Sequence, residues 1–203
     1  MTVPLAESST VVEGGRGHLL FDGTDDSYAT SGVLTMTSAN GKVTVWAGLY
    51  KDVNPGAGQV IELSPSSGSN LNCFAIQAPP GDLTGYFVRS RGAGASDGTV
   101  DLTTPGNVAV KTVLTFIADT GGDLSQIRVD GVIAGTTNVD QGTGGYTNYQ
   151  LFVGRRNNAQ FPFKGRMYGL IWRCTVTTTV QHVADIEQWM APKVGITFTS
   201  GLP

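Results

Sequence analysis

Apolar and polar residues alternate along much of this chain with a period of two, the pattern of β-strands that turn one face toward a core. The clearest run is residues 42–50, where four aliphatic side chains alternate with a second set that contains Trp46 and Tyr50. We expect the aliphatic set to face the core, and Trp46 and Tyr50 to lie together on the other face of the strand. The aliphatic residues are Val43, Val45, Ala47 and Leu49.

Further strand-like runs follow at short intervals, with turn-forming residues between them. Residues 124–134 are predicted to form a hairpin, because the pair Asp130-Gly131 tolerates the positive φ angles of a tight turn. Short strands joined in this way favour two packed antiparallel sheets over one parallel sheet. The other runs are residues 18–21, 27–30, 59–64, 72–77, 85–91, 108–118, 149–154 and 166–176.

One segment near the end of the chain predicts a helix. Thr178 opens a Thr-x-x-Gln sequence with the spacing of a capping box, and apolar residues then recur with helical spacing through residues 183–190. Pro192 is expected to end the pattern. We expect this helix to cover one end or edge of the β-structure and to bury Trp189 or Met190.

The composition supports a single all-β domain. Of 203 residues, 28 are glycine and only 14% are charged, so the helix formers Glu and Lys are scarce. A chain of this length fits one domain. Residues 1–16 are polar and contain Gly14-Gly15, so we expect an N-terminal arm or linker there and one sandwich domain over residues 17–203.

Charge and hydropathy exclude several classes of function. The net charge of −3 argues against a nucleic-acid partner, because such binding needs a clustered excess of Lys and Arg. No run is long and apolar enough to insert into a membrane. The first residues lack the basic start and apolar core of a signal peptide, so we expect none.

Basic residues are nevertheless concentrated in one part of the chain. Residues 141–184 contain five of them and no acid, whereas residues 1–140 contain more acidic than basic groups. Two interpretations remain open: the basic side chains pair with the acidic turns of the first part, or they form a shallow patch for an anionic ligand such as an acidic polysaccharide. The five are Arg155, Arg156, Lys164, Arg166 and Arg173.

Six short segments combine strands, glycine turns and a closing helix in a fixed order. They are residues 21–30 (FDGTDDSYAT), 43–48 (VTVWAG), 127–132 (IRVDGV), 151–155 (LFVGR), 163–171 (FKGRMYGLI) and 185–195 (DIEQWMAPKVG). In this order they resemble the laminin-G-like domain of the concanavalin A-like lectin/glucanase superfamily, in the form found in bacteriophage virion proteins. The resemblance spans residues 17–196. It implies an all-β fold, a two-sheet antiparallel jelly-roll β-sandwich with one short C-terminal helix.

The resemblance also implies a setting and partners. It places the chain on the surface of a virion, in a tail, fibre or capsid decoration. The partners would be other virion subunits, further copies of this chain among them, and host-surface glycans or proteins. The fold alone does not fix a function, because it hosts lectins, hydrolases, receptors and architectural modules.

The residues give little support for catalysis. A glucanase of this superfamily needs two glutamates close together on one strand, but the glutamates here are isolated from one another. His18 and His182 are the only candidate bases, and no nucleophile elbow accompanies them. We therefore expect no enzyme and no catalytic residues. The four glutamates are Glu7, Glu13, Glu62 and Glu187.

No cofactor is required, and calcium is the ion that the chain is best suited to hold. Related laminin-G-like domains often bind calcium at loops on one rim of the sandwich, and hard cations prefer carboxylate and carbonyl oxygens. The alternative is that these aspartates cap turns through the backbone, as aspartates next to glycine do. The candidate ligands are Asp22, Asp25, Asp26, Asp119 and Asp123.

Glycan binding would use aromatic rings that stack on sugars, together with planar polar side chains. Tyr168, Leu170 and Trp172 are predicted to share one face of their strand, and the loop 155–158 directly follows another strand. The alternative is that the aromatic residues fill the core or lie under the helix. The candidate ligand-binding residues are Trp46, Tyr50, Arg89, Arg155, Arg156, Asn157 and Asn158.

Three hypotheses for the function follow. The first is a non-enzymatic virion module that adheres to host glycans or proteins. The second is a purely architectural decoration or cement protein without a glycan ligand. A glycan hydrolase is the third and the least favoured.

Overall fold

A computed structural model describes residues 10–13, 15–36, 41–52, 57–64, 72–78, 85–92, 98–101, 109–142, 144–156, 160–174 and 176–198. Within these ranges the chain forms two antiparallel sheets and one helix, α1 (Val180–Val194), which confirms the all-β sandwich expected from the sequence. Sheet A has seven strands in the order β1-β2-β13-β4-β9-β10-β11, and sheet B has six in the order β3-β12-β5-β6-β7-β8. The strands are β1 (Thr10–Glu13), β2 (Arg16–Asp22), β3 (Tyr28–Ala29), β4 (Lys42–Lys51), β5 (Gly58–Leu63), β6 (Cys73–Ala78), β7 (Phe87–Arg91), β8 (Gly98–Asp101), β9 (Lys111–Asp119), β10 (Leu124–Val129), β11 (Val132–Thr137), β12 (Leu151–Val153) and β13 (Lys164–Cys174).

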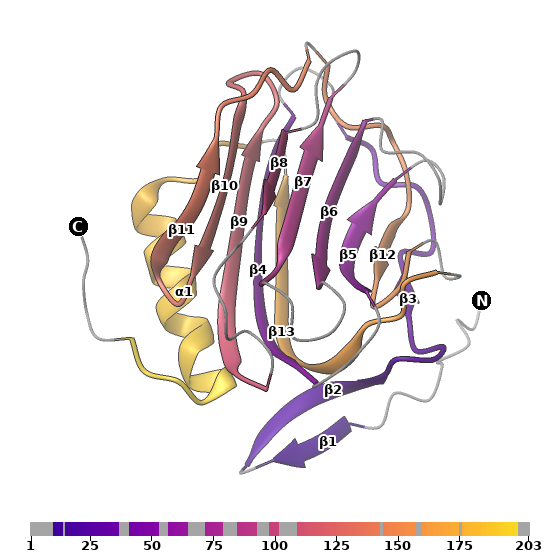
Figure 1. Cartoon of the computed structure of the whole chain (residues 1–203), viewed down its shortest axis with the longest axis vertical. Helices are drawn as coiled ribbons and strands as arrows, with labels where there is room; N and C mark the ends of the chain where they lie inside the picture. Colours follow the sequence, from indigo (N-terminus) through magenta and orange to yellow (C-terminus); the bar gives the residue numbers. More distant parts are fainter. Residues whose placement is uncertain are drawn as a thin grey trace.

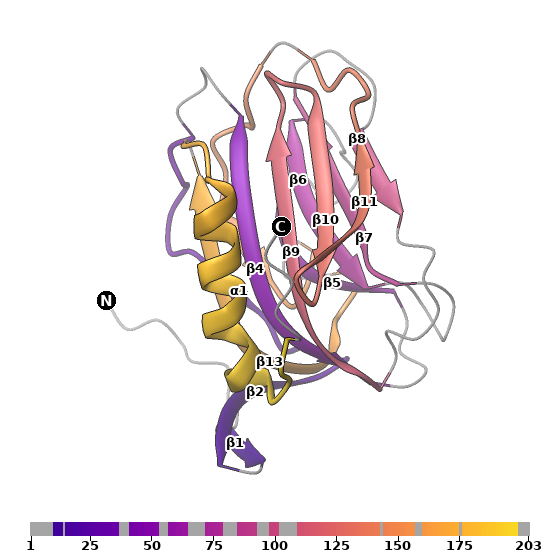
Figure 2. The same cartoon turned by 90° about the vertical axis from the view of Figure 1, so that its left-hand side faces the viewer.

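The elements stack in three layers (Figures 1 and 2). Sheet B packs on one face of sheet A, and α1 lies along the opposite face of sheet A, where it contacts β4, β9 and β13. The main core fills the space between the two sheets, and a second, smaller core lies between sheet A and α1. The helix therefore covers a face of the sandwich, rather than the end or edge that we expected.

Strand β4 shows why the alternation predicts this arrangement. Its four aliphatic residues point into the main core, as expected. Trp46 and Tyr50 point to the other face, where Trp46 is fully buried and belongs to the second core with Val183 and Met190 of the helix. Sheet A is thus covered on both faces at its centre. A strand buried on both faces needs apolar residues at nearly every position.

Two glycines allow α1 to come close to the sheet. A Cβ atom at Gly169 of β13 would lie 2.7 Å from Met190 Sδ, and one at Gly48 of β4 would overlap the side chain of Val194. Real Cβ atoms do not approach other atoms so closely, so a larger residue at Gly48 would push against the short, branched side chain of Val194 and displace the helix. At Gly169 the contact is with the end of the flexible Met190 side chain, which would have to move.

A bulge in β13 overturns the prediction that Tyr168 shares a face with Leu170 and Trp172. The register of β13 with β4 shifts between Met167 and Gly169, so Tyr168 is one extra residue on β13. Such an insertion reverses which face of the sheet the following side chains point to, relative to a regular strand. Tyr168 consequently lies in the second core, whereas Leu170 and Trp172 pack against the main core.

The helix itself differs in detail from the prediction. Its N-cap is Thr179, whose hydroxyl accepts from the backbone N–H of His182 (3.2 Å), whereas Thr178 accepts from the hydroxyl of Thr44 (2.9 Å). Pro192 does not end the helix but lies in its last turn, and Gly195 closes it in the left-handed conformation. Met190 is buried and Trp189 is exposed, so the expected burial falls on Met190.

The structure contains two strands that the sequence did not predict, β1 and β8. Residues 10–13, which the sequence assigns to an arm or linker, pair with β2 as strand β1, while residues 1–9 lie outside the described part. Strand β8 pairs with β7 at the edge of sheet B. The predicted hairpin is confirmed, because Asp130 and Gly131 form the turn between β10 and β11 with φ angles of 49° and 82°.

An ion pair ties α1 to that hairpin. Arg128 of β10 donates through Nε to Glu187 Oε1 (2.8 Å) and through Nη2 to Glu187 Oε2 (3.1 Å), and it also donates to the carbonyl of Gly131 (2.6 Å). The side chains of Glu187 and Arg128 are 2% and 13% exposed. Removal of one partner from such a buried pair leaves an uncompensated charge in the interior.

Glu187→Gln is accordingly expected to lower the free energy of unfolding by about 3 kcal/mol, the lower end of the range for a broken buried pair. Urea denaturation checks the value. Asp185→Asn is the matched control, because Asp185 is an exposed carboxylate on the same helix, and it should change stability by less than about 0.5 kcal/mol. Equal effects of the two substitutions would contradict the role given to the ion pair.

Candidate functional site

The outward face of sheet B gathers the charged residues that are most suited to binding. Glu62 of β5 pairs in register with Ala75 of β6, and Ala75 pairs with Arg89 of β7. These three residues therefore lie in one row across the sheet. Their sequence neighbours Ile61, Phe74 and Val88, among others, belong to the main core, so the row faces away from sheet A.

Glu62 is the anchor of this row. Its side chain is 2% exposed, and the Nε atom of Arg156 lies 2.9 Å from Oε1 and 3.1 Å from Oε2. Arg156 follows β12 in a short loop that is closed by two backbone hydrogen bonds between Arg156 and Gln160. Its guanidinium also lies over the ring of Phe161, 5.1 Å from the centroid. The ion pair and the aromatic ring therefore hold the guanidinium, and the two backbone hydrogen bonds hold the main chain that carries it.

Arg89 lies beside this pair. Its guanidinium covers the ring of Phe87, 4.9 Å from the centroid, on the same face of the sheet. Burial raises the pKa of Glu62 above its ordinary value, and the positive charges of Arg156 and Arg89 and a hydrogen bond from Ser64 only partly oppose that effect. Glu62, Arg89, Arg156, Phe87 and Phe161 are called the arginine face below.

The structure separates the residues that the sequence selects as ligand contacts. Arg89 and Arg156 meet on the arginine face. Trp46 and Tyr50 lie on the opposite side of the molecule, on the face of sheet A that α1 covers, and the full burial of Trp46 there argues against any ligand contact. This position is the one that the alternative interpretation of the aromatic residues expects.

The two arginines of the loop after β12, Arg155 and Arg156, also point to different parts of the molecule. The Nη1 atom of Arg155 donates to the backbone carbonyl of Asp25 (3.4 Å), so its side chain reaches toward the turn after β2 while Arg156 reaches Glu62. Two further predicted contacts, Asn157 and Asn158, lie outside the described residues.

The five basic residues between positions 141 and 184 do not form one patch. Arg155 and Arg156 have the separate partners given above. Arg166 lies over the ring of Tyr50 (4.7 Å to the centroid), and Arg173 approaches His182 of α1 (Nη1 to Nδ1, 3.5 Å). Lys164 pairs in register with Asp22, beside the acidic turn.

Sequence reasoning missed Glu62, Phe87 and Phe161. Glu62 was noted only as one of four isolated glutamates. The available signal was a lone glutamate within a strand that is otherwise apolar or uncharged, Gly58–Leu63, where burial of a charge requires a partner. That partner is 94 residues away in the sequence and could not be identified from spacing.

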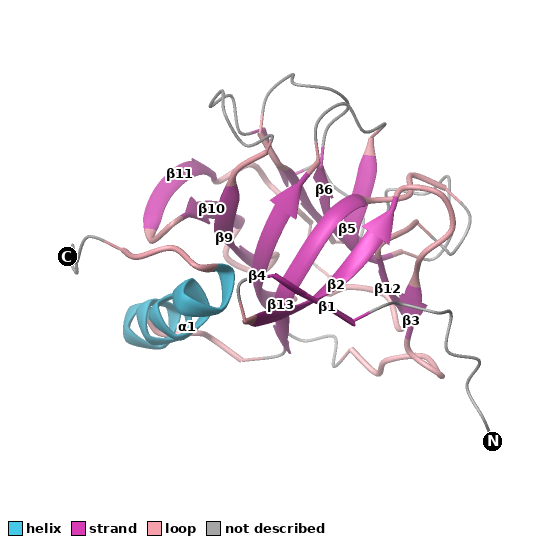
Figure 3. Cartoon of the chain, turned by 90° about the horizontal axis from the view of Figure 1, so that it is seen from below, coloured by secondary structure: helices cyan, strands magenta, loops and turns pink. Residues whose placement is uncertain are grey.

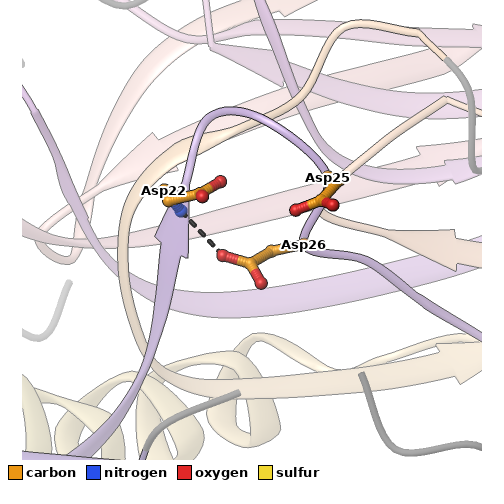
Figure 4. Close-up of side chains that lie close together, drawn as sticks. All are labelled: Asp22, Asp25 and Asp26. Atoms are coloured by element: carbon orange, nitrogen blue, oxygen red, sulfur yellow. Dashed lines mark hydrogen bonds between the residues drawn. The ribbon is translucent and has the colours of Figure 1, made fainter. Parts of the chain in front are cut away.

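Three of the five proposed calcium ligands lie together in the turn between β2 and β3 (Figure 4). Each of Asp22, Asp25 and Asp26 offers a carboxylate oxygen, and these oxygens lie within 4.8 Å of one another. The same carboxylates also cap the turn: Asp26 Oδ2 accepts from the backbone N–H of Asp22 (2.8 Å), and Asp22 Oδ1 accepts from that of Thr24 (2.6 Å).

The other two candidate ligands accept hydrogen bonds from backbone N–H groups. Asp119 Oδ1 accepts from the N–H groups of Gly121 (3.2 Å) and Gly122 (3.1 Å), and its Oδ2 lies 3.3 Å from Lys42 Nζ. Asp123 Oδ1 accepts from the N–H of Gln141 (2.9 Å). The contacts of Asp119 support the turn-capping interpretation, whereas Asp123 accepts from the backbone of a residue 18 positions away in the sequence.

No protein-family model matches the sequence, and no curated protein matches it. Several solved structures share the fold. A heptameric SAP-like pentraxin from Limulus polyphemus is 13% identical with a TM-score of 0.60, over 85% of this chain and 82% of the pentraxin chain. Domain 4 of an extracellular GH43 arabinanase from Geobacillus stearothermophilus, in complex with arabinotriose, is 16% identical with a TM-score of 0.61, over 85% and 77% of the two chains.

A third structure, the CBM40 of a Ruminococcus gnavus IT-sialidase bound to α2,3-sialyllactose, is 11% identical with a TM-score of 0.56. The match covers 78% of this chain and 97% of the CBM40 chain. At these identities the likeness establishes the fold alone. It confirms the two-sheet jelly-roll β-sandwich and gives no support to the laminin-G-like branch or to a phage setting. The described part of the chain contains no helix that is long and apolar enough to cross a membrane.

Substitution of Glu62 should change how stability depends on pH. Because the pKa of Glu62 is raised in the folded state, its charged form is disfavoured there, and the wild-type chain loses stability as the pH rises from 4.5 through the raised value. Glu62→Gln removes this titration. The stability of the variant relative to wild type should therefore increase between a pH below 4.5 and neutrality, as measured by urea denaturation at each pH. A relative stability that falls over this range would contradict burial as the dominant cause.

Proposed function

We propose that this chain is a non-catalytic carbohydrate-binding module and that its ligand lies on the arginine face. The observation that carries the proposal is the fixed pair of guanidinium groups, Arg156 held by Glu62 and Phe161, and Arg89 held over Phe87. A guanidinium presents several N–H donors in a rigid plane, which suits hydroxyl and carboxylate groups of sugars. Donors that are already held in place lose little entropy on binding.

The aromatic residues add the second element of sugar recognition. Phe161 is 37% exposed and Phe87 is half-buried, so each ring edge or face remains accessible beside its arginine. Glycan sites on rigid scaffolds combine such apolar surfaces with a few oriented polar groups. The sialyllactose-bound and arabinotriose-bound neighbours show that this fold can present a sugar-binding face, and that supports the proposal by analogy.

The surroundings of Glu62 support a non-catalytic role. A glycosidase needs a second carboxylate roughly 5–9.5 Å from the first, as acid, base or nucleophile. Among the described residues, the groups that act on the Glu62 carboxyl are two arginines and a serine. A carboxylate held in an ion pair with Arg156 anchors that arginine and is poorly placed to exchange protons with a substrate.

The finer placement comes from the sequence resemblance. Adhesion to host-surface glycans from a virion, together with neighbouring virion subunits, is the setting that the phage-like segments imply. The architectural alternative has one observation in its favour: edge strand β11 exposes Val132 (68%) and Ile133 (54%), and no charged residue occurs between positions 131 and 139. Such an edge suits contact with another subunit.

A glycan array tests the proposal, probed with the labelled protein in calcium and again in chelator. We expect a specific signal, and Arg89→Ala should weaken binding about tenfold or more, because hydrogen bonds from a charged donor are among the stronger ones. Loss of the signal in chelator and in Asp25→Asn would extend the site to the acidic turn.

Arg166→Ala is the matched control, since Arg166 also lies over an aromatic ring but on the helix side of sheet A. It should leave the affinity unchanged. Equal losses in both variants would argue against the arginine face. Silence on the array from folded protein, with self-association that Ile133→Lys abolishes, would favour the architectural role.

A further inference from the structure

A cavity of about 470 Å³ opens between strands β2 and β13 of sheet A and strands β3 and β12 of sheet B, and it shares no residue with the arginine face. Sheet A contributes Leu19 of β2 and Met167 and Leu170 of β13, and sheet B contributes Tyr28 of β3 and Val153 of β12. The ladder between β2 and β13 ends at the pair Leu19–Met167, where the bulge begins, so the two strands are unpaired beyond it. Figure 3 shows β2, β13 and β4 side by side from this end of the molecule.

His18 is the polar residue that sets this cavity apart from an ordinary packing gap. It lines the cavity and is 4% exposed, and its ring lies against that of Tyr168 with centroids 5.3 Å apart. Among the residues that the structure describes, neither ring nitrogen of His18 has a hydrogen-bond partner. A buried imidazole normally satisfies both nitrogens, and each buried polar group left without a partner costs about 1–3 kcal/mol.

A second, polar pocket of about 250 Å³ adjoins the first and shares Gly17 and Tyr168 with it. Arg16 and Lys193 line it, at the end of α1, where Arg16 also donates to the carbonyl of Pro192 (2.9 Å). Lys111 Nζ lies 5.3 Å from the centroid of the Tyr168 ring. Positive charge is thus concentrated beside the open end of an apolar cavity.

We propose that the two pockets together bind a small anionic amphiphile, a molecule with an apolar chain and one carboxylate or sulfate. The chain occupies the cavity, and the anionic group lies at its open end between Arg16 and Lys193, where one of its oxygens meets a His18 nitrogen once the buried ring turns toward the cavity. The cavity volume is within the range of small-molecule sites, which are mostly apolar with a few oriented polar groups. A sugar fits less well here, because its several hydroxyls would be buried against Leu19, Met167 and Leu170 without partners.

Calorimetric titration of the whole chain with decanoate tests the proposal, with decanol as the uncharged probe. Decanoate should bind at least tenfold more tightly than decanol, and raised salt should narrow the difference. Lys193→Gln should weaken decanoate binding severalfold and leave decanol binding unchanged. The control is Lys164→Gln, an exposed lysine that lines neither pocket, and it should have no effect.

Two variants test the cavity itself. His18→Leu should weaken decanoate binding about tenfold without lowering the melting temperature, because an apolar side chain replaces an unsatisfied buried one. Gly17→Leu should abolish binding of both probes, since a Cβ at Gly17 meets no atom within 4 Å and the larger side chain extends from a wall common to both pockets.

Several results would overturn the proposal. One is absence of heat with decanoate in folded wild-type protein, and another is equal binding of decanol and decanoate. Unchanged binding in both His18→Leu and Gly17→Leu would place decanoate elsewhere. If His18→Leu does not fold, Gly17→Leu and Lys193→Gln decide the outcome. Arg89→Ala should bind decanoate normally, so the result is independent of glycan binding on the arginine face.

Discussion

The close packing of α1 on two glycines of sheet A is the constraint on which the rest of the structure depends. The absence of a side chain at Gly48 lets Val194 approach the sheet, Gly169 leaves room for the end of Met190, and this approach encloses Trp46 in a second core. A close contact of this kind tolerates little change in volume, because protein interiors are packed as densely as organic crystals. It also determines what each face of the molecule can do. With sheet B on one side and the helix on the other, the centre of sheet A is committed to packing.

The polar side chains that are candidates for binding accordingly lie on the outward face of sheet B and at the point where β2 and β13 separate. On the outward face of sheet B, a buried carboxylate is tolerated because Arg156 satisfies it, and the same contact fixes the guanidinium in place. Where β2 and β13 separate, the bulge at Tyr168 ends their pairing and leaves space beside His18. One region is rigid and charged, the other open and apolar. They are suited to ligands of different chemistry, and their substitutions can be made separately.

The sequence predicts the fold where the signal is local, and fails where partners are distant. The alternation of β4 assigns both of its faces correctly, and Asp130-Gly131 predicts its hairpin, because each pattern is complete within about ten residues. One extra residue at Tyr168 carries no such pattern, so the facing of that side chain was predicted wrongly. Only part of the candidate site could be predicted from the sequence. Arg89 and Arg156 could be selected as planar polar side chains suited to sugars, but the role of Glu62 depends on its pairing with Arg156, 94 residues away, which no local rule encodes.

The position of β13 has a consequence for how the chain reaches its native state. This strand lies between β2 and β4, although more than a hundred residues separate it from both in the sequence. Until residues 164–174 are in place, the first part of sheet A is divided, and both neighbouring strands expose unpaired backbone groups. Such distant pairings make folding slow, since much of the chain must be ordered before they form. During synthesis from the N-terminus, sheet A can be completed only after residues 164–174 have emerged, so closure of the sandwich comes late.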